Sequence, residues 1–426
     1  MVKLLGSPNI EDPGFIAGMT RLTGYRECRE VLQSRSFGAF ESGGSDRHHF
    51  LGDTLLDING PSHVRRRRLE AQLFSRPSLV GYERDHIRPM IDATLAQLAA
   101  GERAPDGTVH SDLIAVLRSI LYRISAVVSG IDDVHTEDQV ERFRWFVAEL
   151  TAAAMVDFST EDHSEVIRRG LAVRDQFVEE FFQPSLQRRQ RLVEAVRSGR
   201  LTQEELPRDL LTVLVLHQDP SWPEGTVLRE VAGLYLNAST STTLQESTHA
   251  VVHLAQWFED HPEDRTHATS LSFLRPAAHH ALRMHTTAPA LLREALDDTT
   301  LESTGRTIRK GDRLALITRL ANRDPEAFPD PDRFDPRRKV EEGINPWGLT
   351  FGAGEHQCIG RPLVAGLTGR VEDETTTGSL TLILQALFSA GIELRPESPP
   401  VYVTDKHLDA FDAFPVRFTA LGPAGP

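Results

Sequence analysis

The stretch Phe351–Val364, FGAGEHQCIGRPLV, decides the fold of this chain. It places Cys358, one of only two cysteines, among glycines and at the start of a predicted helix. Backbone N–H groups at a helix start and the helix dipole both stabilise a thiolate. Gly352, Gly354 and Gly360 let the backbone fold tightly and approach a flat ligand closely. The stretch therefore predicts a thiolate offered to a ligand, against the alternative of a small buried hydrophobe or an unused loop thiol.

A haem iron takes such an axial thiolate, and the haem carboxylates need donors such as His356. The spacing resembles the cysteine-ligand loop of the cytochrome P450 family, Phe-x-x-Gly-x-His-x-Cys-x-Gly, which is met here by Phe351, Gly354, His356, Cys358 and Gly360. The resemblance implies a mainly α fold with small β-sheets, the cytochrome P450 fold. It also implies haem b (iron protoporphyrin IX) as cofactor, Cys358 as the iron ligand, and Phe351, Gly352, His356 and Gly360 around the cofactor.

The composition is that of an ordinary globular protein, with 40% hydrophobic and 25% charged residues among 426. Because no linker or repeat divides the chain, we expect a single P450 domain over residues 1–426. Two distant cysteines without a CxxC pattern suit a reducing cytoplasm. The N-terminal residues MVKLLGSPNIEDP contain no apolar run for a signal peptide or membrane span. The net charge of −14 argues against a nucleic-acid partner, and we expect a cytoplasmic monomer.

Helical periodicity dominates the chain. Amphipathic segments predict helices over about 77–100, 111–130, 139–156, 165–198 and 231–257. Strands are short: Thr307–Ile317 reads as a hairpin turning at Lys310–Asp312, and a second pair is predicted near Ile392–Leu394 and Val416–Phe418. The proline- and aspartate-rich stretch 322–338 predicts an ordered, non-repetitive meander.

A run of four arginines, Arg65–Arg68, follows Gly60-Pro61. Such a run is usually a solvated helix start. His63 and Arg67, however, lie at i and i+4, on one face of that helix. The segment resembles the P450 helix whose His-x-x-x-Arg pair holds a haem propionate, which implies that role for His63 and Arg67. The neighbouring arginines, Arg66 included, would then add positive potential where the family docks an acidic electron-transfer protein.

Arg293, in PALLREAL, is isolated among apolar residues. A buried arginine is costly without a partner, so this side chain must pair with an anion or reach water. It matches the P450 arginine that binds the other propionate. With His356 it gives the second pair of implied propionate contacts.

The predicted helix 231–257 carries a polar cluster, 237–243, inside apolar surroundings. Serine and threonine there can donate to the carbonyl four residues before. The segment resembles the oxygen-binding part of the P450 I helix, Ala-Gly-x-Asp/Glu-Thr-Thr. Ala238, Thr242 and Thr243 match this pattern, whereas Ser239 replaces the glycine and Ser241 the acid.

The implied catalytic positions are thus Ala238, Ser241 and Thr242. A serine hydroxyl does not titrate near neutrality, so Ser241 cannot deliver protons as a carboxylate would. Three explanations stay open: water or the substrate supplies the protons, the iron performs a chemistry other than hydroxylation, or turnover is slow.

A second departure concerns the Glu-x-x-Arg pair of the P450 K helix, which is matched here by His280 and Arg283. A neutral His280 can accept a hydrogen bond from Arg283, but without charge assistance. Arg333 would be the third member of this structural triad. The alternative of a metal site at His279, His280 and His285 is disfavoured, because these positions do not share a helix face.

A third departure follows the cysteine. Where the family continues directly into a long helix, this chain runs GLTGRVEDETTTGS, which predicts an inserted loop over about 366–379. Its acidic residues 372–374 would oppose an acidic ferredoxin if the loop lies on the docking face.

The resemblance implies a haem-thiolate monooxygenase that oxidises a small organic molecule in specialised metabolism, such as antibiotic biosynthesis. Separate ferredoxin and ferredoxin reductase proteins would supply electrons, because the chain has no flavin domain. One alternative keeps the haem but uses a peroxide-driven, nitrating, coupling or rearranging chemistry. Another is a haem-binding protein without turnover, and a helical protein without haem is a third.

Overall fold

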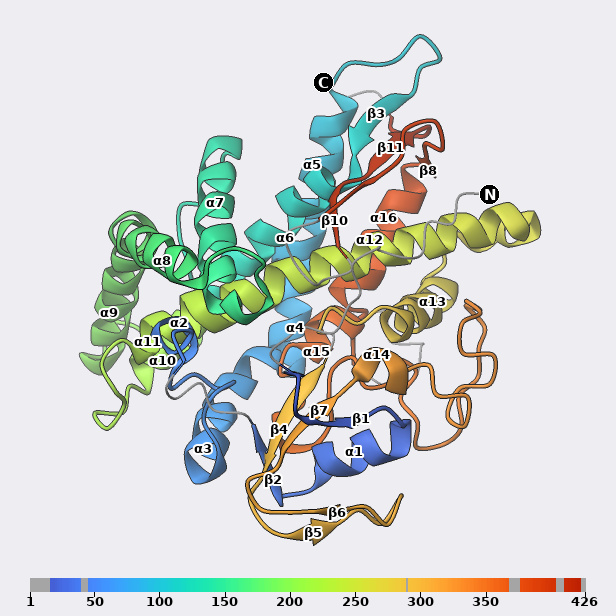
Figure 1. The fold of residues 1–426 in the computed structure, drawn as a ribbon. Coiled ribbons are helices and arrows are strands. Elements are labelled where there is room, and N and C mark those ends of the chain that lie inside the picture. The colour runs from blue at the N-terminus through green and yellow to red at the C-terminus, as the bar shows by residue number, and fades with distance from the viewer. Residues whose placement is uncertain (1–15, 40–44, 289, 368–375, 404–409, 423–426) are drawn as a thin grey trace. The chain divides into compact units, whose positions relative to one another are not determined.

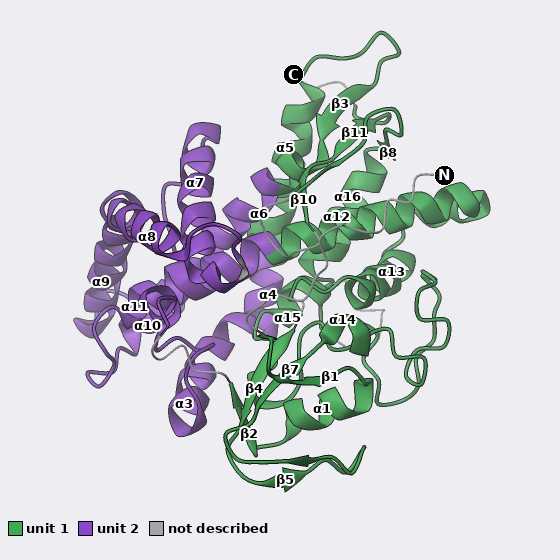
Figure 2. Ribbon diagram, viewed as in Figure 1, with its two compact units in different colours: residues 1–40, 83–117, 242–426 green, residues 41–82, 118–241 purple. Residues whose placement is uncertain are grey.

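The computed structural model describes residues 16–39, 45–288, 290–367, 376–403 and 410–422 (Figure 1). Contacts divide the chain into two compact units (Figure 2). The first unit comprises residues 1–40, 83–117 and 242–426, and the second comprises 41–82 and 118–241. Each unit is assembled from separate stretches of sequence. The expectation of one domain over 1–426 stays a prediction.

The four β-sheets found among the described residues all belong to the first unit. Its largest sheet has the order β1-β7-β4-β2, with β1 parallel to β7 and the other pairs antiparallel. The four strands are β1 (Thr20–Leu22), β7 (Arg313–Leu316), β4 (Leu291–Ala295) and β2 (Phe37–Ala39). The smaller sheets are formed by β3 (Val109–Asp112) with β11 (Pro415–Phe418) and β8 (Ile392–Leu394), by β9 (Val401–Tyr402) with β10 (Phe411–Ala413), and by β5 (Thr299–Thr300) with β6 (Thr307–Ile308).

One hydrophobic core of the first unit joins the helix Tyr25–Gln33 to the largest sheet, and Leu22, Val31, Leu314 and Phe328 are among its buried residues. Apolar burial of this kind is the main favourable contribution to folding. The helices and helical turns are α1 (Tyr25–Gln33), η3 (Glu83–Ile87), α5 (Arg88–Ala99), the major part of α12 (Leu236–Asp260), η8 (Pro262–His267), α13 (Leu271–Met284), α14 (Thr318–Ala321), η9 (Gly354–His356), α15 (Arg361–Ala365) and α16 (Ser379–Ser389).

The second unit is almost entirely helical. Side chains begin several of its helices: Thr136 and Gln139 form a capping box before α7, and Asp162 caps α8. Its helices and turns are α2 (His48–Leu51), α3 (Gly60–Glu70), η2 (Ala71–Phe74), α4 (Arg76–Tyr82), most of α6 (Leu113–Ser129), α7 (Glu137–Ala154), η4 (Val156–Phe158), α8 (His163–Phe177), η5 (Val178–Phe182), α9 (Gln183–Arg197), η6 (Gln203–Glu205), α10 (Leu210–Leu216), α11 (Thr226–Leu228) and η7 (Arg229–Tyr235).

The mainly α fold with small β-sheets is confirmed, but three long predicted helices are divided. π-helical turns interrupt the regular hydrogen bonding at 83–87, 178–182 and 229–235. The predicted pair of Ile392–Leu394 with 416–418 is confirmed as β8 and β11. The Thr307–Ile317 hairpin is wrong: its turn is present, but β6 pairs with β5 and β7 with β4 and β1.

Within the described part of the chain, no helix combines the length and the apolar character needed to cross a membrane.

Candidate functional site

The cysteine loop presents an exposed thiol. Cys358 is exposed, and its amide donates to the carbonyl of Phe351 at 2.8 Å. The chain's other thiol, Cys28, is fully buried, and burial together with Glu27 and Asp324 raises its pKa far above the usual range. Because a thiolate is the form that binds iron, Cys358 and not Cys28 is suited to ligation.

Two glycines shape this loop. Gly352 and Gly354 both lie in the left-handed region, at φ +63° and +70°. A Cβ at Gly354 would lie 2.2 Å from the carbonyl oxygen of Leu32, whereas at Gly352 it would lie 3.6 Å from Leu291. Gly354 is therefore required, because the two backbones approach each other too closely for a Cβ. Gly352 packs the loop against β4, the strand that carries Arg293.

The helix after the cysteine is short, as expected from the loop predicted to follow it at about 366–379. α15 has five residues and begins at Arg361, after Gly360 as its N-cap. Its dipole is correspondingly small, so it stabilises a thiolate less than a long helix would. Arg361 lies over the Trp347 ring at 5.2 Å and interacts electrostatically with Cys358, which adds positive charge near the sulfur.

Arg293 is buried without a carboxylate. It is 7% exposed, and its guanidinium donates to the carbonyl of Leu292 at 2.8 Å. Burial lowers its pKa to about 10, and among the described residues no acidic side chain forms an ion pair with it. A buried cation of this kind needs an anion, as the sequence predicted. His356, on the turn η9, is half-buried in the same unit.

One face of the long helix is accessible although most of the helix is buried. Leu234, Ala238, Ser241 and Thr242 are spaced by one and two helical turns and are half-buried or exposed. Their neighbours Leu236, Thr240 and Thr243 are buried. The predicted catalytic positions therefore share one open face of α12.

The hydroxyls of this segment are bonded to their own helix. Ser239 donates to the carbonyl of Tyr235 at 2.7 Å, Thr240 to that of Leu236 at 2.8 Å, and Ser241 to that of Asn237 at 3.3 Å. The predicted bonding to the carbonyl four residues before is confirmed. The Ser241 bond is long and weak, and serine offers no titratable proton in its place.

His63 and Arg67 lie on α3, as expected from their spacing. His63 is fully buried, Arg67 is half-buried, and Arg65 and Arg68 are exposed. The expectation that Arg66 adds positive potential to a docking surface is wrong, because its side chain is only 5% exposed.

Arg66 instead forms an ion pair with Glu230 at 2.8 Å. Glu70 and Tyr235 complete this buried cluster, which the sequence analysis missed. Two features of the sequence could have indicated this cluster. Arg66 and Glu70 are four residues apart and so are neighbours on one helix face, and Glu230 is a single acid in an apolar helical segment.

The replacement in the K helix is accommodated by hydrogen bonds. Arg283 donates to Nε2 of His280 at 2.7 Å and to the carbonyls of Asn322 at 2.5 Å and Pro331 at 2.6 Å. Nε2 therefore accepts, so Nδ1 carries the proton and donates to the carbonyl of Asp335 at 2.8 Å. The predicted Arg283–His280 bond is confirmed.

Arg333 is not the third member of that group. It is exposed and forms no hydrogen bond with His280 or Arg283 in the described part of the chain. The positive charge of a different arginine, Arg338, lies near enough to lower the pKa of both His280 and Arg283.

The ends of the predicted inserted loop meet closely. A Cβ at Gly366 would lie 2.5 Å from the Thr377 carbonyl, and one at Gly378 would lie 2.5 Å from the Gly366 amide. The carboxylate of Glu83 accepts from the amides of Thr376 at 3.1 Å and Gly378 at 2.8 Å. Residues 368–375, including the acidic positions 372–374, lie outside the described residues.

Comparison with known proteins defines the class. The cytochrome P450 family model matches residues 18–365, and the chain belongs to the cytochrome P450 family. It is an oxidoreductase of the monooxygenase type, since relatives across most of its length carry that activity in their names.

Two relatives illustrate the range of similarity. Mycinamicin IV hydroxylase/epoxidase of Micromonospora griseorubida is 27% identical over 377 residues, which cover 86% of this chain and 81% of that protein. Sterol 14alpha-demethylase of Mycolicibacterium vanbaalenii is 31% identical over 195 residues, or 40% of this chain and 43% of that protein.

The fold agrees with solved structures. The crystal structure of P450BioI, in complex with an acyl carrier protein ligated to hexadec-9Z-enoic acid, matches with a TM-score of 0.69 at 20% identity. The match covers 94% of this chain and 92% of that one. At this identity the likeness concerns the fold alone.

Family membership implies a haem-thiolate cofactor, and the residues present fit it. Cys358 offers an exposed sulfur, Arg293 is a buried cation in need of an anion, and α12 keeps a face open beside Thr242.

Proposed function

We propose that this P450 binds haem b and oxidises a small organic molecule in specialised metabolism, in the cytoplasm. One observation carries the cofactor assignment: the loop that exposes the Cys358 thiol packs on β4, whose Arg293 is buried without a carboxylate among the described residues. The mycinamicin hydroxylase/epoxidase supports specialised metabolism, because it is similar over most of both chains.

The site residues take distinct roles in this proposal. Cys358 ligates the iron, and Phe351, Gly352 and Gly360 form the loop around it. His63 and Arg67 hold one propionate, and Arg293 with His356 the other, because guanidinium and imidazolium groups donate well to carboxylates. When bound, the haem supplies the redox chemistry of oxygen activation.

The open face of α12 governs proton supply. The Thr242 hydroxyl can donate a hydrogen bond to a ligand beside this face, whereas Ala238 leaves room for it. Ser241 has no acidic proton, so water or the substrate must provide the protons that a carboxylate would otherwise relay. Ferredoxin and ferredoxin reductase supply the electrons, and the exposed Arg65 and Arg68 offer positive charge to an acidic donor.

The serine at position 241 also favours a second candidate function. A haem-thiolate enzyme with peroxide-driven, nitrating, coupling or rearranging chemistry, or a haem-binding protein without turnover, does not need an acid there. Ser241 instead donates to the Asn237 carbonyl, although weakly at 3.3 Å.

Spectroscopy and turnover test these alternatives in sequence. Purified, reduced protein should give the carbon monoxide difference band of a thiolate-bound haem, Cys358→Ala should lose it, and Cys28→Ala should keep it. A wild-type protein without this band would overturn the haem assignment.

Substrates that perturb the Soret band should then be supplied with ferredoxin, its reductase and NAD(P)H. Substrate-dependent oxygen consumption with a product that gains oxygen supports the monooxygenase. Product formation only with peroxide or another oxidant supports the second candidate.

A further inference from the structure

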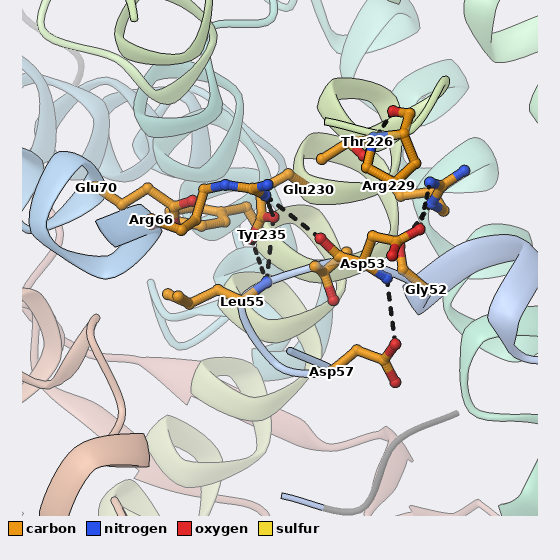
Figure 3. Close-up of polar contacts among 12 residues, drawn as sticks. Gly52, Asp53, Leu55, Asp57, Arg66, Glu70, Thr226, Arg229, Glu230 and Tyr235 are labelled. Atoms are coloured by element: carbon orange, nitrogen blue, oxygen red, sulfur yellow. Dashed lines mark hydrogen bonds and ion pairs between the residues drawn. The ribbon is translucent and has the colours of Figure 1, made fainter. Parts of the chain in front are cut away.

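A buried polar cluster connects α3 to the π-helical turn η7 within the second unit (Figure 3). Arg66 and Glu70 lie one turn apart on α3, and Glu230 and Tyr235 lie on η7. All four are at most 6% exposed. α3 is also the helix of His63 and Arg67, so whatever fixes α3 also fixes these two side chains.

Glu230 is the centre of this cluster. Its carboxylate accepts from Nη1 of Arg66 at 2.8 Å and from the amide of Leu55 at 3.0 and 3.2 Å. It therefore binds α3 and the segment before α3 to the same turn. Arg66 also lies over the Trp222 ring at 4.0 Å, which restricts the guanidinium further.

The turn itself is held to the same region at two other points. Arg229 donates to the Gly52 carbonyl at 2.6 Å and pairs with Asp53 at 3.1 Å. A Cβ at Gly233 would lie 1.8 Å from the Phe50 carbonyl oxygen, so the two backbones touch. η7 is thus held to residues 50–53 independently of the cluster, and α3 is joined to η7 by the contacts of the cluster.

Glu70 is the unusual member. Tyr235 donates its hydroxyl to Oε2 of Glu70 at 2.9 Å, and Oε1 is buried without a hydrogen-bond partner among the described residues. Two buried carboxylates thus face a single buried guanidinium. An ionised buried carboxylate needs compensation, and Arg66 is already paired with Glu230.

The charges around Glu70 act in both directions. Burial and the nearby Glu230 raise the pKa of Glu70 well above its usual range, and Tyr235, Arg66 and Arg67 oppose this. Burial also raises the pKa of Glu230 to about 7, against the opposing effect of Arg66.

Further ionisable groups near the cluster are Arg229 beside Glu230, Tyr82 of α4 beside Tyr235 and Asp219 beside Arg66. α2 and α7, which pack on η7, also carry ionisable side chains, among them the exposed His48 and His49 of α2. η2 and α10, which pack on α3, contain no ionisable side chain.

We propose that Glu70 and Glu230 share one proton and act as positioning residues, which in that state fix α3 so that His63 and Arg67 hold their haem propionate. The inference rests on the proposed function. Loss of the shared proton leaves two negative charges beside one guanidinium in a site that is buried from solvent. α3 then separates from η7 and the propionate contacts weaken.

Haem release from the holoenzyme to an excess of apomyoglobin tests this, measured from mildly acidic to alkaline pH. Wild-type release should accelerate as pH rises. Glu70→Gln keeps the shape of a neutral acid but cannot ionise, so its release should stay slow and nearly independent of pH. Glu230→Gln removes the carboxylate that pairs with Arg66 and accepts from the Leu55 amide, so α3 loses its direct ion pair to η7 and haem release should be about tenfold faster at every pH. The exposed Glu224→Gln is the matched control and should follow the wild type.

A purely structural role for Glu70 predicts a different result, in which Glu70→Gln changes the release rate by one factor at all pH values. That result, or a wild-type profile that is flat with pH, overturns the inference while the haem assignment stands. If the wild type contains no haem, the proposed function fails instead. Amide exchange of α3 then judges the cluster alone: exchange that rises with pH in the wild type but not in Glu70→Gln supports it, and equal exchange overturns it.

Discussion

His280 offers a direct test of how the K-helix replacement stabilises the fold. The imidazole is 3% exposed, accepts from Arg283 through Nε2 and donates to the Asp335 carbonyl through Nδ1. The bond from Arg283 requires the neutral ring, because a protonated Nε2 cannot accept. Burial, followed by the charge of Arg283, lowers its pKa to about 3 from the ordinary 6.5.

The direction of the pH effect follows from these values. The unfolded chain takes up a proton at this imidazole near pH 6.5, whereas the folded chain takes it up only near pH 3. Stability from the neutral ring is complete above pH 6.5 and is lost as pH falls through that window. Between about pH 7 and about pH 5 the free energy of unfolding should fall by about 2 kcal/mol from His280 alone.

His280→Gln removes this titration and keeps an acceptor for Arg283 and a donor for the Asp335 carbonyl. The fall in unfolding free energy between neutral and mildly acidic pH should therefore shrink by about 2 kcal/mol, although His279 still contributes to it because burial lowers its pKa to about 4. Urea unfolding of both proteins at the two pH values measures the difference, and the exposed His135→Gln is the control. An unchanged fall in His280→Gln would refute the reasoning.

Three further outcomes are expected. Gly354→Ala should lower the free energy of unfolding by about 3 kcal/mol, because the added Cβ would lie 2.2 Å from the Leu32 carbonyl oxygen. The control is Gly343→Ala, at φ +83° with nothing within 4 Å, which should lower it by about 1 kcal/mol. Equal losses in urea unfolding would contradict the role of the contact. Arg293→Met should stabilise the haem-free protein by up to about 3 kcal/mol and weaken haem binding, so a stability change of the same sign in both forms would argue against a propionate role. Ser241→Asp should raise product formation at least about tenfold with the ferredoxin system, whereas Ser241→Ala should not, and no gain from the aspartate would show that protons do not limit turnover.

Local features of this fold could be predicted from the sequence, whereas most of the long-range pairing could not. The residues 351–360 carry a fixed spacing that is recognisable without the rest of the chain, and the strand pair predicted near 392–394 and 416–418 is confirmed as β8 and β11. The turn at 310–312 was also correct. The sequence predicted that the strands on either side of this turn pair with each other, because a hairpin joins neighbouring segments. In the structure β7 pairs with β4 and β1 instead.

Arg66 illustrates the same limit within the candidate site. Four adjacent arginines look alike in sequence, and only the phase of α3 sends one of them inward. Its partner Glu230 lies 164 residues away, so no local pattern joins the two. The π-helical turn that presents Glu230 also has no recognised sequence signature, although such turns are frequent at functional positions.

The two departures from the family pattern have different consequences, and the hydrogen bonds explain why. At His280 the lost carboxylate served to hold an arginine, and Arg283 is now held by an imidazole and two backbone carbonyls, so the structural role is filled without a negative charge. At Ser241 the lost carboxylate would have carried a proton, and a hydroxyl with a weak bond to its own helix does not replace that. The first substitution therefore gives no reason to doubt a folded, haem-binding P450. The second bears only on the chemistry performed there, which is why Ser241→Asp and product analysis, more than any stability measurement, will distinguish hydroxylation from the other haem-thiolate reactions.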